Sequence, residues 1–114
     1  MAGEFVVTED AYRDIERAED YIASHSGEDA VIAFEDELFC KFDEVAETPL
    51  RWPVYQFGDG IELVHEYRSA NVRRYKIFYY VRGGDVQSGG DAQAGVVVVA
   101  RVLHVASDFT RRNW

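Results

Sequence analysis

The chain has 114 residues, of which 47% are hydrophobic, and it carries a net charge of −9 at pH 7. That length predicts one domain over residues 1–114, with enough apolar residues to bury a core without metal or disulfides. The single cysteine, Cys40, excludes an internal disulfide. No segment approaches the roughly 18 apolar residues of a membrane span, and the N-terminus lacks the pattern of a signal peptide. We therefore expect a soluble, cytoplasmic protein.

The acidic residues are concentrated in one part of the chain. Residues 8–47 contain 14 acidic and three basic residues, a local charge of −11, so the remainder carries +2. An acidic protein is a poor non-specific ligand for nucleic acid, because such binding depends on neutralising phosphates. A local basic site is compatible with this charge. The composition therefore predicts an acidic helical part and a mildly basic sheet part.

Two helices are predicted in the first half, after a short β-branched strand at residues 4–7. Thr8 can cap the first helix, whose opening turn contains Glu9 and Asp10 next to the positive end of its dipole. A capping-box pattern at residues 26–29 predicts the start of the second helix, and Pro49 predicts its end. The second helix has one apolar face, formed by Val31, Phe34, Leu38, Phe42 and Val45. The short connection between the helices predicts an antiparallel hairpin. The apolar neighbours of Cys40 predict a buried, inert thiol.

The most informative segment is residues 72–81, which is rich in β-branched and aromatic residues and predicts a central strand. Alternation of side chains places one set on the core: Arg73, Tyr75, Ile77, Tyr79 and Val81. The opposite set mixes cations with aromatic rings and is expected to meet a partner: Val72, Arg74, Lys76, Phe78 and Tyr80.

Two further strands are predicted at residues 61–68 and 96–105, the latter buried on both faces. A tight turn at residues 69–71 would join the first of these to the central strand. Loops are predicted at residues 50–60 and 83–95. The resulting order is β-α-α-β-β-β, an α+β fold in which a helical hairpin packs on one face of a small, mainly antiparallel sheet.

This order, together with several short motifs, resembles the ParE/RelE superfamily of toxins from type II toxin–antitoxin systems. The motifs are Ala-x-x-Asp-Ile at residues 11–15, Phe-x-x-x-Leu at 34–38, Arg-x-Tyr-Lys-Ile-Phe-Tyr at 73–79 and Val-Leu-His at 102–104. Pro49 after the second helix also matches the superfamily. The resemblance covers residues 5–109 and implies the fold described above.

The resemblance implies one of two activities. RelE-like members cut mRNA on the ribosome by acid–base chemistry, with cations that stabilise the phosphate, whereas ParE-like members bind and inhibit DNA gyrase. Here Lys76 occupies a position where the ribonuclease branch usually has arginine, residues 106–108 read Ala-Ser-Asp instead of basic residues, and the tail has no tyrosine. These departures and the Val-Leu-His motif favour the ParE-like branch. A repurposed, non-toxic scaffold of the same fold is a third interpretation.

Site residues follow from these alternatives. A ribonuclease needs a base, an acid and charge stabilisation around one phosphate. The candidates for those roles are His65, Arg68, Arg74, Lys76 and His104. For the histidines, ordinary structural positions at the surface or at a strand end are the simpler interpretation.

The resemblance also implies a cognate antitoxin as partner, DNA gyrase or the ribosome and its mRNA as target, and a toxin–antitoxin hetero-oligomer. No membrane partner is expected. The candidate partner-binding residues are Arg73, Arg74, Lys76, Phe78, Tyr80, Phe109, Arg111, Arg112 and Trp114. The histidine spacing predicts no metal site, and no glycine-rich loop leads from a strand into a helix, so no cofactor is expected.

Overall fold

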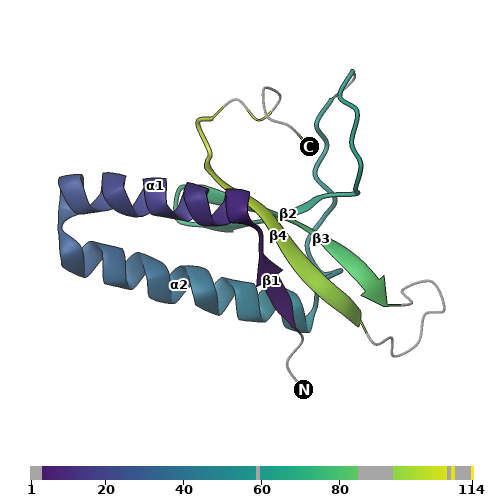
Figure 1. Cartoon of the computed structure of the whole chain (residues 1–114), viewed down its shortest axis with the longest axis horizontal. Helices are drawn as coiled ribbons and strands as arrows, with labels where there is room; N and C mark the ends of the chain where they lie inside the picture. Colours follow the sequence, from purple (N-terminus) through teal and green to yellow (C-terminus); the bar gives the residue numbers. More distant parts are fainter. Residues whose placement is uncertain (1–3, 59, 85–93, 108, 110–113) are drawn as a thin grey trace.

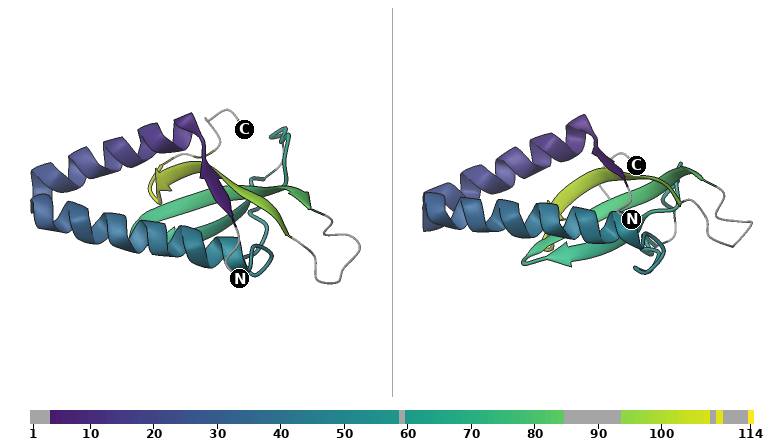
Figure 2. Two further views of the ribbon diagram at one scale, coloured as in Figure 1. Left: turned by 60° about the horizontal axis from the view of Figure 1, so that its bottom comes forward. Right: turned by 90° about the horizontal axis from the view of Figure 1, so that it is seen from below.

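The computed structural model describes residues 4–58, 60–84, 94–107, 109 and 114. The elements in chain order are β1 (Phe5–Val7), α1 (Glu9–Ser26), α2 (Glu28–Glu47), β2 (Arg68–Val72), β3 (Tyr75–Gly84) and β4 (Ala94–His104). The two helices run antiparallel, side by side, and lie over one face of the sheet (Figures 1 and 2). This confirms the predicted order β-α-α-β-β-β and the α+β class.

The four strands form one sheet in the order β1-β4-β3-β2, so the last strand in the sequence lies inside the sheet. β1 pairs with β4 in parallel, and β4–β3 and β3–β2 are antiparallel. The sheet is therefore mainly antiparallel, as predicted. Val97, Val98 and Val99 are all buried although successive side chains point to opposite faces, so β4 is covered on both faces, which explains the apolar run in its sequence.

Local sequence signals determine the helix ends. The Thr8 hydroxyl oxygen accepts the Ala11 backbone N–H at 3.1 Å and so caps α1, and α2 ends at Glu47 just before Pro49. The predicted capping box at residues 26–29 does not form. Instead Gly27, with φ +89°, lies between the two helices in a backbone conformation that favours glycine, and α2 has no side-chain cap.

The core lies between the helical hairpin and the sheet. Phe34, Leu38 and Phe42 of α2 pack in one buried cluster with Ile77 and Tyr79 of β3. The alternation predicted for β3 is thus confirmed from Tyr75 onward. Before Tyr75 it is wrong, because Arg73, assigned to the core, is exposed in a turn, and Val72, assigned to the opposite face, is buried in the core. The buried Tyr79 hydroxyl donates a hydrogen bond to the Pro49 carbonyl at 2.5 Å, and burial raises the pKa of Tyr79 to about 12. This bond connects the central strand to the end of α2.

The predicted strand at residues 61–68 is wrong, as is the turn at 69–71. Only Arg68 of that segment is in β2, and residues 69–71 pair with β3, with Asn71 opposite Lys76. The turn is at Arg73–Arg74, where Arg73 has a φ of +54°. Pairing with an already favourable strand has overridden the weak β propensity of the Ser-Ala-Asn segment. The predicted central strand consequently begins at Tyr75 rather than at residue 72.

A β-bulge interrupts the β3–β4 pairing. Phe78 lies opposite Arg101 and Tyr79 lies opposite Val99, so Ala100 is an extra residue on β4. Because of this insertion, Val99 and Val102 both face the helical core although they are three residues apart. A strict alternation along β4 would have placed one of them on the opposite face.

Three further features are the exposure of Cys40, the character of the helices and the distribution of metal-ligating side chains. Cys40 is exposed on α2, so the prediction of a buried thiol is wrong. Within the described residues, no helix has both the length and the apolar character needed to cross a membrane. The same residues contain no group of three or more metal-ligating side chains.

Candidate partner-binding surfaces

The cations of the β2–β3 hairpin do not share one face. Arg73 lies in the turn, where its guanidinium donates two hydrogen bonds of 2.9 and 2.8 Å to the Glu37 carboxylate of α2. These bonds lower the pKa of Glu37. Arg74 is exposed in the same turn, whereas Lys76 is on β3 with its ammonium 5.6 Å from the centre of the Tyr55 ring. The turn therefore breaks the alternation that was expected to pair Arg74 with Lys76.

The second face of β3 is not open, because the chain covers it with its own aromatic residues. Phe78 is fully buried, with its ring centroid 5.0 Å from Tyr55 and from Phe109 and 4.8 Å from Trp114. The expectation that this face of the strand is open to a partner is therefore wrong at Phe78, which is not on the free surface. We call this group the aromatic cluster; its members are Tyr55, Phe57, Tyr67, Phe78, Tyr80, Phe109 and Trp114.

The tail residues expected to bind a partner contact the protein's own sheet. The Trp114 indole N–H donates to the Phe109 carbonyl at 2.8 Å, and the Tyr67 hydroxyl donates to the Trp114 carbonyl at 3.4 Å. Burial raises the pKa of Tyr67, which keeps this hydroxyl protonated. Two further predicted partner residues, Arg111 and Arg112, lie outside the described residues.

The ribonuclease candidates are dispersed over the sheet. The His65 ring stacks on Tyr80 at 3.6 Å, on the face of the aromatic cluster. His104 instead meets the edge of Tyr75, whose ring packs on the helical side of the sheet. The Arg68 guanidinium donates hydrogen bonds to the Leu50 and Trp52 carbonyls and so stabilises the loop after α2. The two histidines are therefore on opposite faces of the sheet.

Two of the candidates, Arg74 and His104, lie near one another along the backbone. The Val105 N–H donates to the Arg74 carbonyl at 2.8 Å, and His104 lies opposite Tyr75 in the sheet. These contacts place the β2–β3 turn beside the end of β4. The His104 ring is oriented by a hydrogen bond, in which Nδ1 accepts the Ala106 backbone N–H at 3.1 Å.

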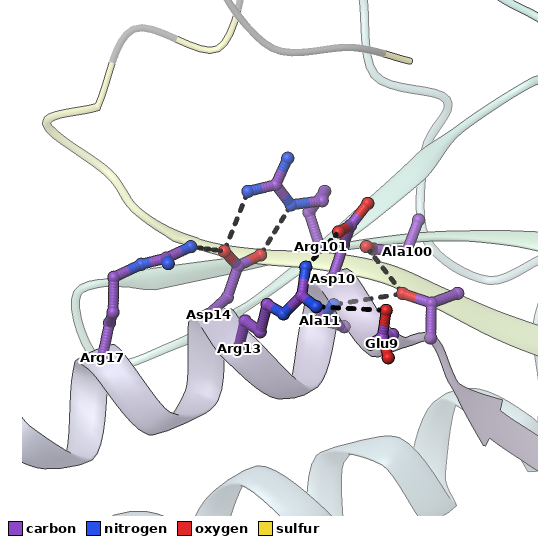
Figure 3. Close-up of polar contacts among 9 residues, drawn as sticks. Glu9, Asp10, Ala11, Arg13, Asp14, Arg17, Ala100 and Arg101 are labelled. Carbon is purple, nitrogen blue, oxygen red and sulfur yellow. Dashed lines mark hydrogen bonds and ion pairs between the residues drawn. The ribbon is translucent and has the colours of Figure 1, made fainter.

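The most buried ionic group is Asp14, which the sequence analysis noted only as part of a motif. Its side chain is 1% exposed and accepts hydrogen bonds from Arg17 Nη2 at 2.7 Å and from the Val102 N–H at 3.0 Å. Arg101 adds two bonds, through Nε at 2.7 Å and Nη2 at 2.8 Å (Figure 3). These bonds raise the pKa of Arg101. Nothing in the periodicity predicts the contact, because it joins residues 87 positions apart in the chain.

A helical hairpin on one face of a mixed four-stranded sheet, in the order β-α-α-β-β-β, defines the small α+β toxin fold that the motifs led us to expect. The sequence model of the family described as "ParE toxin of type II toxin-antitoxin system, parDE" matches residues 5–109. The chain therefore belongs to the ParE toxin family.

A solved structure supports the same fold. The chain is similar to one from the "Chromosomal ParDE TA system from P. aeruginosa", with a TM-score of 0.65 and 10% sequence identity. The similarity covers 90% of this chain and 96% of the other. At that identity the likeness shows the fold alone. Comparison with curated proteins gives no match.

Proposed function

We propose that this ParE-family toxin acts by binding and inhibiting DNA gyrase, and that a cognate antitoxin neutralises it. Membership of the ParE family over residues 5–109 is the observation that carries the proposal. The solved relative comes from a toxin–antitoxin system, which supports an antitoxin as partner. Binding rather than catalysis is further supported by the arrangement of the ionisable side chains.

RNA cleavage through a 2′-hydroxyl requires an acid, a base and a cation around one phosphate. The His65 ring stacks on Tyr80 of β3. Tyr80 and Lys76 are four residues apart on this strand, which separates them by about 13 Å. His104 lies on the other face of the sheet. Tyr75, next to it, has its pKa raised by burial, which disfavours the phenolate that a base would need. This dispersion supports an inhibitor that acts by binding.

The outer surface of the helical hairpin is the expected binding surface for the antitoxin. Its segment carries a local charge of −11, and its outer surface presents apolar side chains among the carboxylates. Ile32 is 57% exposed and Phe39 is also exposed, both on α2. An antitoxin segment with apolar and basic side chains complements this surface. We therefore expect the toxin–antitoxin Kd to rise with salt between about 0.05 and 0.5 M, because salt screens exposed charges.

The decisive experiment is gyrase supercoiling with purified toxin, titrated, with the toxin–antitoxin complex as control. Inhibition that the antitoxin reverses supports the proposal. If folded toxin leaves supercoiling unchanged, gyrase is not its target. A translation reaction that monitors mRNA cleavage would then test the RelE-like alternative. Normal bacterial growth when the chain is produced alone would indicate the non-toxic scaffold.

A further inference from the structure

A groove of about 360 Å³ lies between α1 and the carboxyl end of β4, away from the aromatic cluster. Arg17 and Tyr21 line it from α1, Tyr75 from the start of β3, and His104 from the end of β4; Ser107 follows in the next turn. These elements meet where the β2–β3 turn is hydrogen-bonded to the segment after β4. The groove is thus built from three separate parts of the chain.

The lining of the groove is rich in hydrogen-bond donors and poor in free acceptors. Asp14, the one carboxylate among the lining residues, already accepts the four hydrogen bonds described above. Because His104 Nδ1 faces the Ala106 N–H, a neutral ring carries its proton on Nε2, which remains as a donor. The Arg17 guanidinium and the Ser107 hydroxyl are further donors. A ligand for this groove must therefore supply acceptor atoms.

Aromatic rings form the apolar part of the lining. The Tyr75 ring packs 5.3 Å from Phe34 on one side and 5.3 Å from His104 on the other. The Tyr21 ring stacks on His25 at 4.0 Å. Since neighbours hold both rings, the groove has preformed aromatic walls beside its donors. Burial and the nearby Tyr21 raise the pKa of Tyr75, so its hydroxyl stays protonated.

Arg17, the cation that lines the groove, is not fully neutralised by the carboxylate beside it. Asp14 is also paired with Arg101, which does not line the groove, so Arg17 keeps part of its positive charge although the chain carries −9 overall. The exposed Arg74 is nearby, since its carbonyl accepts the N–H of Val105. A groove with one incompletely neutralised cation beside acidic helices attracts a single carboxylate more readily than a polyanion, which the helices repel.

We propose that this groove binds an acidic peptide segment of a protein partner. The carboxylate of the segment contacts Arg17, His104 Nε2 and Ser107, and a neighbouring aromatic or apolar side chain packs against Tyr21 and Tyr75. The volume suits two side chains and is at the lower end of the range for small-ligand pockets. The inference does not depend on gyrase being the target, because it concerns the chemistry of the groove alone.

The test is an NMR titration of the whole chain with two acetylated, amidated dipeptides, Phe-Glu and Phe-Gln, which differ only in the carboxylate. We expect Phe-Glu to shift the resonances of Tyr21, Tyr75 and His104, and to bind about tenfold more tightly than Phe-Gln, the effect of one charge-assisted hydrogen bond. Equal affinities, shifts confined to other regions, or no binding of Phe-Glu up to about 20 mM would overturn the proposal.

Two variants and a control locate the contact. Arg17→Gln removes the cation while Arg101 still holds Asp14, and Ser107→Ala removes one hydroxyl; each should weaken Phe-Glu binding, the first by about tenfold. Arg13→Gln is the control, because Arg13 also pairs with carboxylates on α1 and is 60% exposed, against 66% for Arg17. Equal weakening by Arg13→Gln would refute the site. So would binding of a short single-stranded oligonucleotide at the groove without binding of Phe-Glu, since that would assign the groove to nucleic acid.

Discussion

Replacing Asp14 by alanine should destabilise the fold more than any other single change among the charged residues of α1. The substitution removes a side chain that is 1% exposed and leaves Arg101, 13% exposed, without its carboxylate, together with an unpaired Val102 N–H. Removing one partner from a buried ion pair typically costs about 3–5 kcal/mol. For a chain of this length, that loss lowers Tm by about 12–20 °C.

The assay is urea and thermal unfolding followed by circular dichroism, with Asp14→Asn as a milder variant that keeps one acceptor oxygen. Asp10→Ala is the control, since Asp10 is exposed on the same helix and its 3.9 Å contact with Arg13 is worth under about 1 kcal/mol. The double variant Asp14→Leu with Arg101→Met should recover much of the loss, because an apolar pair leaves no buried charge uncompensated. If Asp14→Ala cost less than about 1 kcal/mol, the Asp14–Arg101 pair would behave like an exposed ion pair and the reasoning from its burial would be wrong.

Three further predictions follow from buried or coupled side chains. Burial, a hydrogen bond to Glu35 and repulsion by neighbouring carboxylates raise the pKa of Glu19 to about 7 from an ordinary 4.5. Because the carboxyl group ionises at lower pH in the unfolded chain than in the folded protein, it lowers the stability of the fold as pH rises from about 4.5 to 7. Glu19→Gln should therefore stabilise the protein at pH 8 but not at pH 4, by under about 1 kcal/mol because the carboxylate is partly exposed; an equal effect at both pH values would contradict this cause. Tyr79→Phe should cost about 1–2 kcal/mol in urea unfolding by leaving the buried Pro49 carbonyl unpaired, and an unchanged midpoint would mean that this bond contributes nothing. Phe78→Ala should cost about 3–5 kcal/mol as a core substitution, whereas a residue available on the free surface would change stability by less than about 0.5 kcal/mol.

The sequence was sufficient for the parts of the fold that local chemistry determines. Thr8 has a capping hydroxyl, Pro49 ends a helix, and apolar spacing along α2 selects the face that packs on the sheet. Alternation along β3 correctly assigned Ile77 and Tyr79 to the core. Each of these signals acts within a few residues, so it can be recognised in the sequence without knowledge of the tertiary structure.

The remaining features depend on contacts between distant segments. The Ser-Ala-Asn segment has weak β propensity, yet it forms β2 because it pairs with β3. Val64 has strong β propensity but lies exposed in a loop. Trp114 has no periodic neighbours that would assign it to the aromatic cluster, and the Asp14–Arg101 pair joins residues 87 positions apart. For the candidate site, the sequence could not show that the proposed residues are distributed over two faces of the sheet.

The position of β4 has a consequence for synthesis of the toxin. Thr8 and Ala100 form a hydrogen bond across 92 positions of the chain, and β1 has no strand partner other than β4 in the described sheet. Neither β1 nor the edge of β3 that pairs with β4 can form its hydrogen bonds until β4 has left the ribosome. Until then a nascent chain exposes the apolar face of its helical hairpin. We expect the folded toxin to form only after β4 has emerged, so an antitoxin that is already present can meet it at that point.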